Sequence, residues 1–175
     1  MKYLNIEIKA RCAAPDRIRR LLLEHKADFK GTDYQTDTYF KVPHGRLKLR
    51  EGNIENSLIF YNRPNQPEPK DAQVSLYHCQ PDAALKTTLT SALGVLVEVK
   101  KKREIYVIEN VKFHIDEVED FGSFIEIEAI DLDRTIGREK LLEQCQKYMD
   151  LFDIRDMDLV SGSYSDILLN LKKLS

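Results

Sequence analysis

Four strand-length segments of this sequence alternate between apolar and polar or charged residues. The pattern runs through residues 4–11, 46–50, 111–119 and 123–130. Successive side chains of a β-strand point to opposite faces, so each segment predicts a strand with one apolar and one polar face. Such strands are typical of an antiparallel sheet that is packed on one side only. The repetition of a strongly charged face in segment after segment is the unusual feature.

The rest of the chain adds strands and helices to this sheet. Further strands are predicted at 35–40, 57–63, 72–79 and 95–108, which brings the total to about eight. The last of these carries Val95, Val97, Val99, Lys101 and Arg103 on one side. Prolines, glycines and apolar stripes at helical spacing predict helices at 15–31, 81–94, 137–152 and 164–171. Residues 64–71, with three prolines, are expected to form an exposed loop. We predict one α+β domain over residues 1–175, an antiparallel sheet that curls or closes with helices outside.

Composition limits the function. With 27 basic and 29 acidic residues the net charge is only -2, so we expect neither nucleic acid nor a membrane as partner. No apolar run approaches the roughly 20 residues that span a bilayer, and the sequence enters a strand without a signal segment. Three widely spaced cysteines are expected to be free thiols in a reducing compartment. These features together favour a cytoplasmic protein.

The charged faces of the strands carry two sets of side chains. The cations are Lys9, Arg11, Arg46, Lys48, Arg50, Arg63, Lys101 and Arg103, and the carboxylates are Glu7, Asp116, Glu126 and Glu128. Cations converging from several strands suit a chain of phosphates, since arginine binds phosphate as a fork and lysine as a point charge. Glu126 and Glu128 project side by side, and an oxygen-only site of this kind favours Mg²⁺ or Mn²⁺.

Each charged strand taken alone is more simply interpreted as the solvent face of a sheet, where salt bridges contribute little. Taken together, dense like charges at neighbouring positions are costly unless a counter-charge is supplied. The residues therefore favour a site for a polyanion and a metal, but by themselves they do not identify the ligand or the reaction.

The sequence resembles the CYTH superfamily, the triphosphate tunnel metalloenzymes named for class IV adenylate cyclases and thiamine triphosphatases. The family's Glu-x-Glu-x-Lys motif on the first strand corresponds here to Asn5-x-Glu7-x-Lys9. Further matching segments follow in order at 37–40 (Asp-Thr-Tyr-Phe), 47–50, 61–64, 99–103, 116, 122–128 and 163–168. The opening strand, the proline-rich loop and the Ser-Tyr-Ser-Asp segment are most similar to the class IV adenylate cyclase-like branch.

The resemblance implies an eight-stranded antiparallel β-tunnel with inward-facing charges and flanking helices. It assigns metal binding to Glu7, Asp116, Glu126 and Glu128, and triphosphate binding to Lys9, Lys48, Arg50, Arg63, Lys101 and Arg103. Glu7, Lys9, Glu126 and Glu128 would also be the catalytic residues. Lys70 competes with Arg63 for one cation position, and His114 is expected to be structural. Only the resemblance points to a homodimer.

The departure from the family pattern is Asn5, which stands where the family has its first glutamate. An amide can offer a carbonyl oxygen to a metal but brings no charge, so a second metal would bind more weakly here. Three functions therefore stay open. The first is a cyclase that converts ATP to cyclic AMP and pyrophosphate, and the second is a hydrolase of an organic or inorganic triphosphate. The third is a non-catalytic module that binds triphosphate or polyphosphate.

Overall fold

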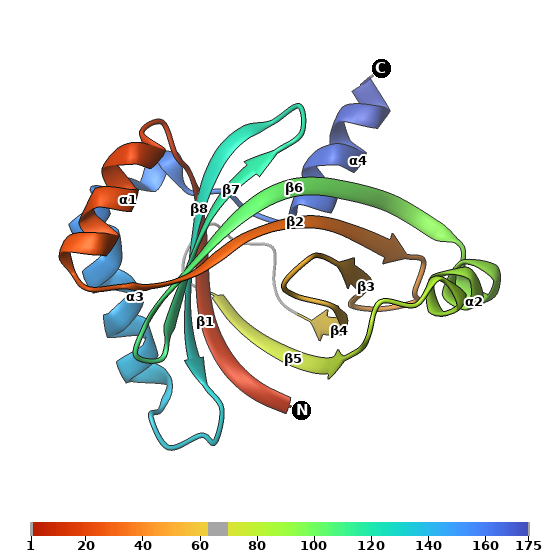
Figure 1. Ribbon diagram of the computed structural model, residues 1–175, viewed down its shortest axis with the longest axis horizontal. Coiled ribbons are helices and arrows are strands. Elements are labelled where there is room, and N and C mark those ends of the chain that lie inside the picture. The colour runs from red at the N-terminus through yellow and green to blue at the C-terminus, as the bar shows by residue number, and fades with distance from the viewer. Residues whose placement is uncertain (1, 63–69, 175) are drawn as a thin grey trace.

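Eight antiparallel strands close into a barrel in this computed structural model, which describes residues 2–62 and 70–174 (Figure 1). The strands are β1 (Lys2–Arg11), β2 (Asp28–Phe40), β3 (Arg46–Glu51), β4 (Ser57–Asn62), β5 (Lys70–His78), β6 (Val95–Ile108), β7 (Val111–Val118) and β8 (Gly122–Asp131). Around the barrel their order is β1-β5-β4-β3-β2-β6-β7-β8. The predicted eight-stranded antiparallel tunnel is confirmed, and each strand pairs with a neighbour on both sides.

Helices flank this barrel. Within the described ranges they are α1 (Pro15–Glu24), α2 (Ala83–Leu93), α3 (Arg138–Phe152) and α4 (Tyr164–Leu174), with a short 3₁₀ helix at Asp156–Asp158. In Figure 1, α1 and α3 lie together on one side of the barrel, while α2 lies at the opposite end of the molecule. Asp82 caps α2 by accepting a hydrogen bond from the backbone N–H of Ala84, and Gly94 ends that helix.

The apolar faces of β1, β7 and β8 pack outward against α1 and α3. Ile6, Phe113 and Ile127 are fully buried in this outer core. The stripe predicted for the third helix is confirmed, and it consists of Leu141, Cys145, Tyr148, Met149 and Phe152. Side chains alternate along a strand. Because the apolar side chains of β1, β7 and β8 are buried on the outside of the barrel, the charged side chains between them point into it.

The predicted boundary between the first helix and the second strand is wrong. The helix was expected to extend to Gly31, but α1 ends at Glu24 and β2 begins at Asp28. Lys26 has a left-handed backbone (φ 58°), and the β2–β6 register shifts between Phe29 and Gly31. Pairing with the long strand β6 therefore overrides a local sequence that lacks a clear strand pattern.

Two further expectations concern the whole chain. The cysteines Cys12, Cys79 and Cys145 are free, as predicted. Burial raises the pKa of Cys145 to about 12, so this thiol stays protonated in the core. In the part of the chain that the structure describes, no helix combines the length and the apolar character needed to cross a bilayer.

The outer core gives a direct prediction for stability. Leu141 is fully buried between α3 and the barrel, so Leu141→Ala should destabilise the fold by about 2–5 kcal/mol through lost burial and a cavity. Leu132 is 60% exposed, and Leu132→Ala should change stability by less than about 0.5 kcal/mol. Urea unfolding of both variants measures the difference, and equal stabilities would contradict this description of the core.

Candidate active site

The inward-facing residues enclose a cavity of about 420 Å³ along the barrel. This volume is in the range of small-molecule binding sites. The structure brings eight of the predicted site residues to its wall, and they are Glu7, Lys9, Lys48, Arg50, Lys101, Arg103, Glu126 and Glu128. The solvent-face interpretation of the charged strands is therefore excluded for these residues, because they line an internal tunnel.

One group of cations gathers on a single buried carboxylate, Asp37, and we call it the Asp37 cluster. The Nζ atom of Lys48 lies 2.8 Å from Oδ2 of Asp37, and Nζ of Lys101 lies 3.3 Å from the same oxygen. Arg50 donates from Nε to Oδ1 at 2.9 Å and from Nη2 to Oδ2 at 3.0 Å. Asp37 thus holds cations from β3 and β6 at one place in the tunnel wall.

The charges of the Asp37 cluster shift one another's pKa values. Burial alone would raise the pKa of Asp37, but Arg50, Lys101 and Lys48 outweigh it and hold that pKa well below its usual range. Burial lowers the pKa of Lys101 to about 7, helped by Arg103 and opposed by Asp37. The cluster therefore carries surplus positive charge, and Lys101 is the member whose protonation changes near neutral pH.

A second group surrounds Arg103, and we call it the Arg103 cluster. Arg103 donates to Oδ1 of Asp116 at 2.7 Å and to Oε2 of Glu126 at 2.7 Å. Lys9 lies 3.0 Å from Oε1 of Glu126. Although burial would raise the pKa of Glu126, Arg103 and Lys9 hold it well below its usual range. These buried charges neutralise one another across β1, β6, β7 and β8.

The start of α4 closes over the Arg103 cluster. The hydroxyl of Tyr164 donates to Oδ2 of Asp116 at 2.7 Å, and Nζ of Lys9 lies 3.6 Å from the centre of the Tyr164 ring. Asp116 is therefore fully buried behind Arg103, with partners on both carboxylate oxygens. The structure places Asp116 as the counter-ion of Arg103, away from the cavity wall where the metal was expected.

Asn5 is tied to the acidic wall of the tunnel. Its Nδ2 atom donates to Oε1 of Glu128 at 2.5 Å, whereas its buried Oδ1 atom has no hydrogen-bond partner within residues 2–62 and 70–174. A glutamate at this position would face Glu128 as a second negative charge. The amide instead removes that repulsion and leaves one acceptor oxygen unused.

This donor set can be compared with what a magnesium or manganese ion requires. Among the described residues, no three carboxylate, histidine or cysteine side chains are close enough to hold a metal by themselves. Magnesium usually binds through one or two carboxylates together with substrate phosphates and water. Glu7, Glu126 and Glu128 on the tunnel wall, and the unused oxygen of Asn5, fit a metal that is shared with a phosphate ligand.

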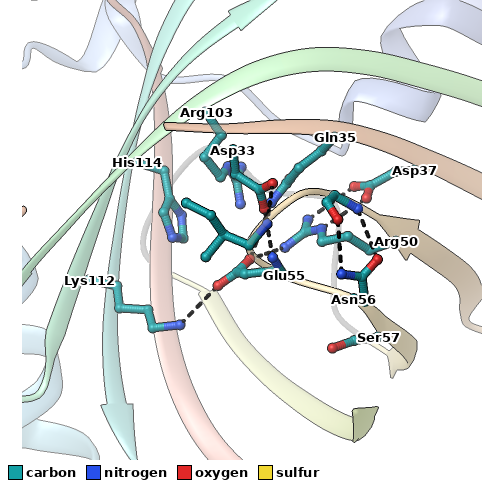
Figure 2. Close-up of polar contacts among 12 residues, drawn as sticks. Asp33, Gln35, Asp37, Arg50, Glu55, Asn56, Ser57, Arg103, Lys112 and His114 are labelled. Atoms are coloured by element: carbon teal, nitrogen blue, oxygen red, sulfur yellow. Dashed lines mark hydrogen bonds and ion pairs between the residues drawn. The ribbon is translucent and has the colours of Figure 1, made fainter. Parts of the chain in front are cut away.

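The loop between β3 and β4, residues 52–56, folds back against the tunnel (Figure 2). Both carboxylate oxygens of the buried Asp33 accept from this loop, at 2.9 Å from the backbone N–H of Ile54 and 2.9 Å from that of Glu55. The side chain of Glu55 then contacts Arg50 at 2.9 Å and Lys112 at 3.3 Å. The tunnel therefore contains a carboxylate that belongs to a loop and not to a strand.

Several of these residues were missed or placed differently by the sequence analysis. Asp37 was noted only as part of a motif, and Glu55 had no signal, because its role depends on loop folding. Lys112 lay on the polar face of the predicted strand 111–119, but no role was assigned to it. His114, expected to be structural, lines the tunnel with its Nδ1 atom 3.4 Å from Oε2 of Glu126, and its buried Nε2 atom has no hydrogen-bond partner among the described residues. Arg63 lies outside the described residues, as do 64–69 of the expected loop.

Comparison with known proteins identifies a family whose model matches this sequence. The model of the CYTH domain family matches residues 4–151. In a comparison with curated proteins, none matches.

Similar solved structures share the fold over nearly the whole chain. The PH1012 protein from Pyrococcus horikoshii OT3 is 24% identical with a TM-score of 0.78, over 93% of this chain and 98% of its own. A putative adenylate cyclase from Vibrio parahaemolyticus is 19% identical with a TM-score of 0.76, over 95% and 98%. The putative adenylyl cyclase HpAC1 from Hippeastrum, described as having a dominant triphosphatase activity, is 16% identical with a TM-score of 0.62, over 96% of each chain. With a family match that spans most of the sequence and a closed, charge-lined tunnel, this chain belongs to the CYTH domain family.

Proposed function

We propose that the tunnel binds a triphosphate together with Mg²⁺ or Mn²⁺ and catalyses a reaction at one of its phosphorus atoms. The observation that carries this proposal is the convergence of five cations and three carboxylates on one internal cavity. The cations are Lys9, Lys48, Arg50, Lys101 and Arg103, and the carboxylates are Glu7, Glu126 and Glu128. A chain of phosphates needs several cations at once, and a phosphate-bound metal needs carboxylate oxygens beside them.

Binding of a triphosphate and a metal would replace ion pairs that the protein already forms within the tunnel. Glu126 is paired with Lys9 and Arg103 in the tunnel wall. A phosphate chain would take over these cations, and the released carboxylate would become available to the metal. Asp37 and Asp116 stay behind the cations and keep Arg50 and Arg103 oriented, because their own carboxylates are buried in the wall.

The metal, when bound, supplies charge neutralisation on the phosphate oxygens and activation of the attacking oxygen. Glu7, Glu126 and Glu128 would hold it. The protein's own cations stabilise negative charge as it develops on the phosphorus oxygens and on the leaving group. Positioning by a rigid barrel contributes the rest, since the charged side chains come from several strands of one closed sheet.

Two reactions can use this arrangement. In a cyclase the ribose 3′-oxygen of ATP attacks the α-phosphorus and pyrophosphate leaves, and the resemblance to the class IV branch supports this reaction. In a triphosphatase a water molecule attacks the terminal phosphorus of a nucleotide, thiamine triphosphate or tripolyphosphate. The description of the Hippeastrum neighbour supports that reaction.

A non-catalytic triphosphate-binding module is the second candidate function. It is favoured by the amide of Asn5 in place of a carboxylate and by the lack, in the described residues, of a ready-made metal cage. This candidate keeps the cation clusters but has no turnover.

The deciding experiment is incubation of the protein with ATP, thiamine triphosphate and tripolyphosphate, each with Mg²⁺ or Mn²⁺, followed by separation of the products. Cyclic AMP with pyrophosphate would identify the cyclase, and orthophosphate would identify the hydrolase. Tight tripolyphosphate binding without any product would support the non-catalytic module. Neither binding nor turnover of any of the three compounds would contradict the proposal.

Removing one carboxylate tests the assignment of the acidic wall. Glu126→Gln should lower metal-dependent turnover at least about 100-fold, because the metal loses a charged ligand. Binding of tripolyphosphate without metal should persist, because Lys9 and Arg103 lose a competing carboxylate. Glu117→Gln is a matched control on the outer face of β7, with a side chain 69% exposed, and should behave like the wild type. A normal rate in Glu126→Gln would remove Glu126 from the site.

The lowered pKa of Lys101 predicts proton uptake on binding. With a pKa of about 7, Lys101 is mostly neutral at pH 8, and a neighbouring polyanion raises that pKa. Tripolyphosphate binding at pH 8 should therefore take up about one more proton in the wild type than in Lys101→Met. At pH 6, where Lys101 is already charged, the difference should vanish.

Calorimetry in two buffers with different protonation enthalpies measures this uptake. Lys102→Met is the control, since Lys102 lies on the outer face of β6 with a side chain 40% exposed. Equal uptake in the wild type and in Lys101→Met at pH 8 would show that Lys101 does not change its charge.

A further inference from the structure

The loop between β3 and β4 is built to hold one carboxylate at a fixed place in the tunnel. Asp33 is fully buried and anchors the backbone of Ile54 and Glu55, as described above. The backbone N–H of Tyr34 donates to Oδ1 of Asn53 at 2.6 Å and fastens the same loop to β2. Gly52 is required for this approach, because a Cβ atom there would lie 2.4 Å from Oδ1 of Asp33.

The carboxylate of Glu55 links the loop to a strand that is distant in sequence. Glu55 lies two residues before β4, and its partner Lys112 lies on β7. The backbone of Glu55 is held by Asp33 on β2, and only β6 lies between β2 and β7, so the loop brings this carboxylate to the tunnel within reach of Lys112. Figure 2 shows Glu55 reaching from the loop toward Lys112, with His114 on the same side as Lys112.

Glu55 also lies directly next to the Asp37 cluster. Arg50 uses Nε and Nη2 for Asp37, and its remaining Nη1 atom donates to Oε2 of Glu55 at 2.9 Å. Burial would raise the pKa of Glu55, but Arg50 and Lys112 hold it well below its usual range, so this carboxylate is negatively charged at neutral pH. A phosphate chain seated on Arg50 therefore meets a fixed negative charge at the next position.

We propose that Glu55 is the residue that limits the length of the phosphate chain in this tunnel. Its carboxylate closes the tunnel beyond the Asp37 cluster, so that a triphosphate is accepted and a longer polyphosphate is disfavoured by repulsion. This inference rests on the proposed function and names a specificity-determining residue of the same site. It assigns no catalytic role to Glu55, which acts through its charge and its fixed position.

A gate is the alternative role for the same contact. In a gate, the Glu55–Lys112 pair would open to admit any polyanion, and breaking it from either side would have the same effect. A fixed stop behaves differently, because Asp33 and Arg50 hold Glu55 in place even when Lys112 is removed. Variants on the two sides of the pair therefore distinguish the two roles.

The test is calorimetric titration of pyrophosphate, tripolyphosphate and tetrapolyphosphate into metal-free protein. The wild type should bind tripolyphosphate more tightly than pyrophosphate and gain nothing from the fourth phosphate. In Glu55→Gln, tetrapolyphosphate affinity should rise about tenfold, while pyrophosphate affinity should change less than about threefold. In Lys112→Gln, the ratio of tetrapolyphosphate to tripolyphosphate affinity should stay as in the wild type. Thermal unfolding of each variant checks that the fold is intact.

Glu117→Gln is the matched control for the loss of one negative charge, and its chain-length profile should equal that of the wild type. An equal gain for all three chain lengths in Glu55→Gln, or a loss of affinity, would overturn the proposal while leaving triphosphate binding intact. The same change in Lys112→Gln as in Glu55→Gln would identify a gate and overturn the fixed stop. If the wild type binds none of the three compounds, the proposed function itself fails and the inference with it.

Discussion

Mutual neutralisation of buried charges is the interaction on which this structure depends. An unpaired charge inside a barrel is costly, and removing one partner of a buried pair usually destabilises a protein. Here Asp37 serves three cations, and Asp116 and Glu126 share Arg103. The same pairs also suit ligand binding. A phosphate chain can replace the carboxylate as the partner of a cation, and a metal can replace the cation as the partner of a carboxylate.

The outer core makes this arrangement possible. Apolar residues of β1, β7 and β8 are buried against α1 and α3, so the alternate residues of these strands must face the tunnel. Closure of the sheet then brings charged residues from strands that are distant in sequence to one cavity. Glu55 is the exception, since a loop anchored on Asp33 brings it to the tunnel beside Lys112. The strands thus fix the positions of the cations that would bind phosphate. The loop places the carboxylate of Glu55 next to them, where we propose that the phosphate chain ends.

Most of the fold could be predicted, because alternation of apolar and charged residues is a local signal. It indicated the positions of β1, β3, β7 and β8 and placed Lys9, Lys48 and Glu126 on the charged faces of their strands. The start of β2 could not be predicted, since residues 28–34 become a strand only by pairing with β6. Asp116 carried the same signal as Glu126, and only the structure shows that Arg103 and Tyr164 occupy it. Contacts across the closed barrel leave no trace in local sequence.

The central claim is that the tunnel holds a triphosphate on its cation clusters and a metal on its acidic wall. A crystal structure with tripolyphosphate and Mn²⁺, using the anomalous signal of manganese, measures both positions directly. The account predicts a manganese peak beside Glu126 and Glu128, and phosphate oxygens within hydrogen-bond distance of Lys48, Arg50 and Arg103. A tunnel that stays empty at saturating ligand, or phosphate bound only on the outer surface, would contradict it.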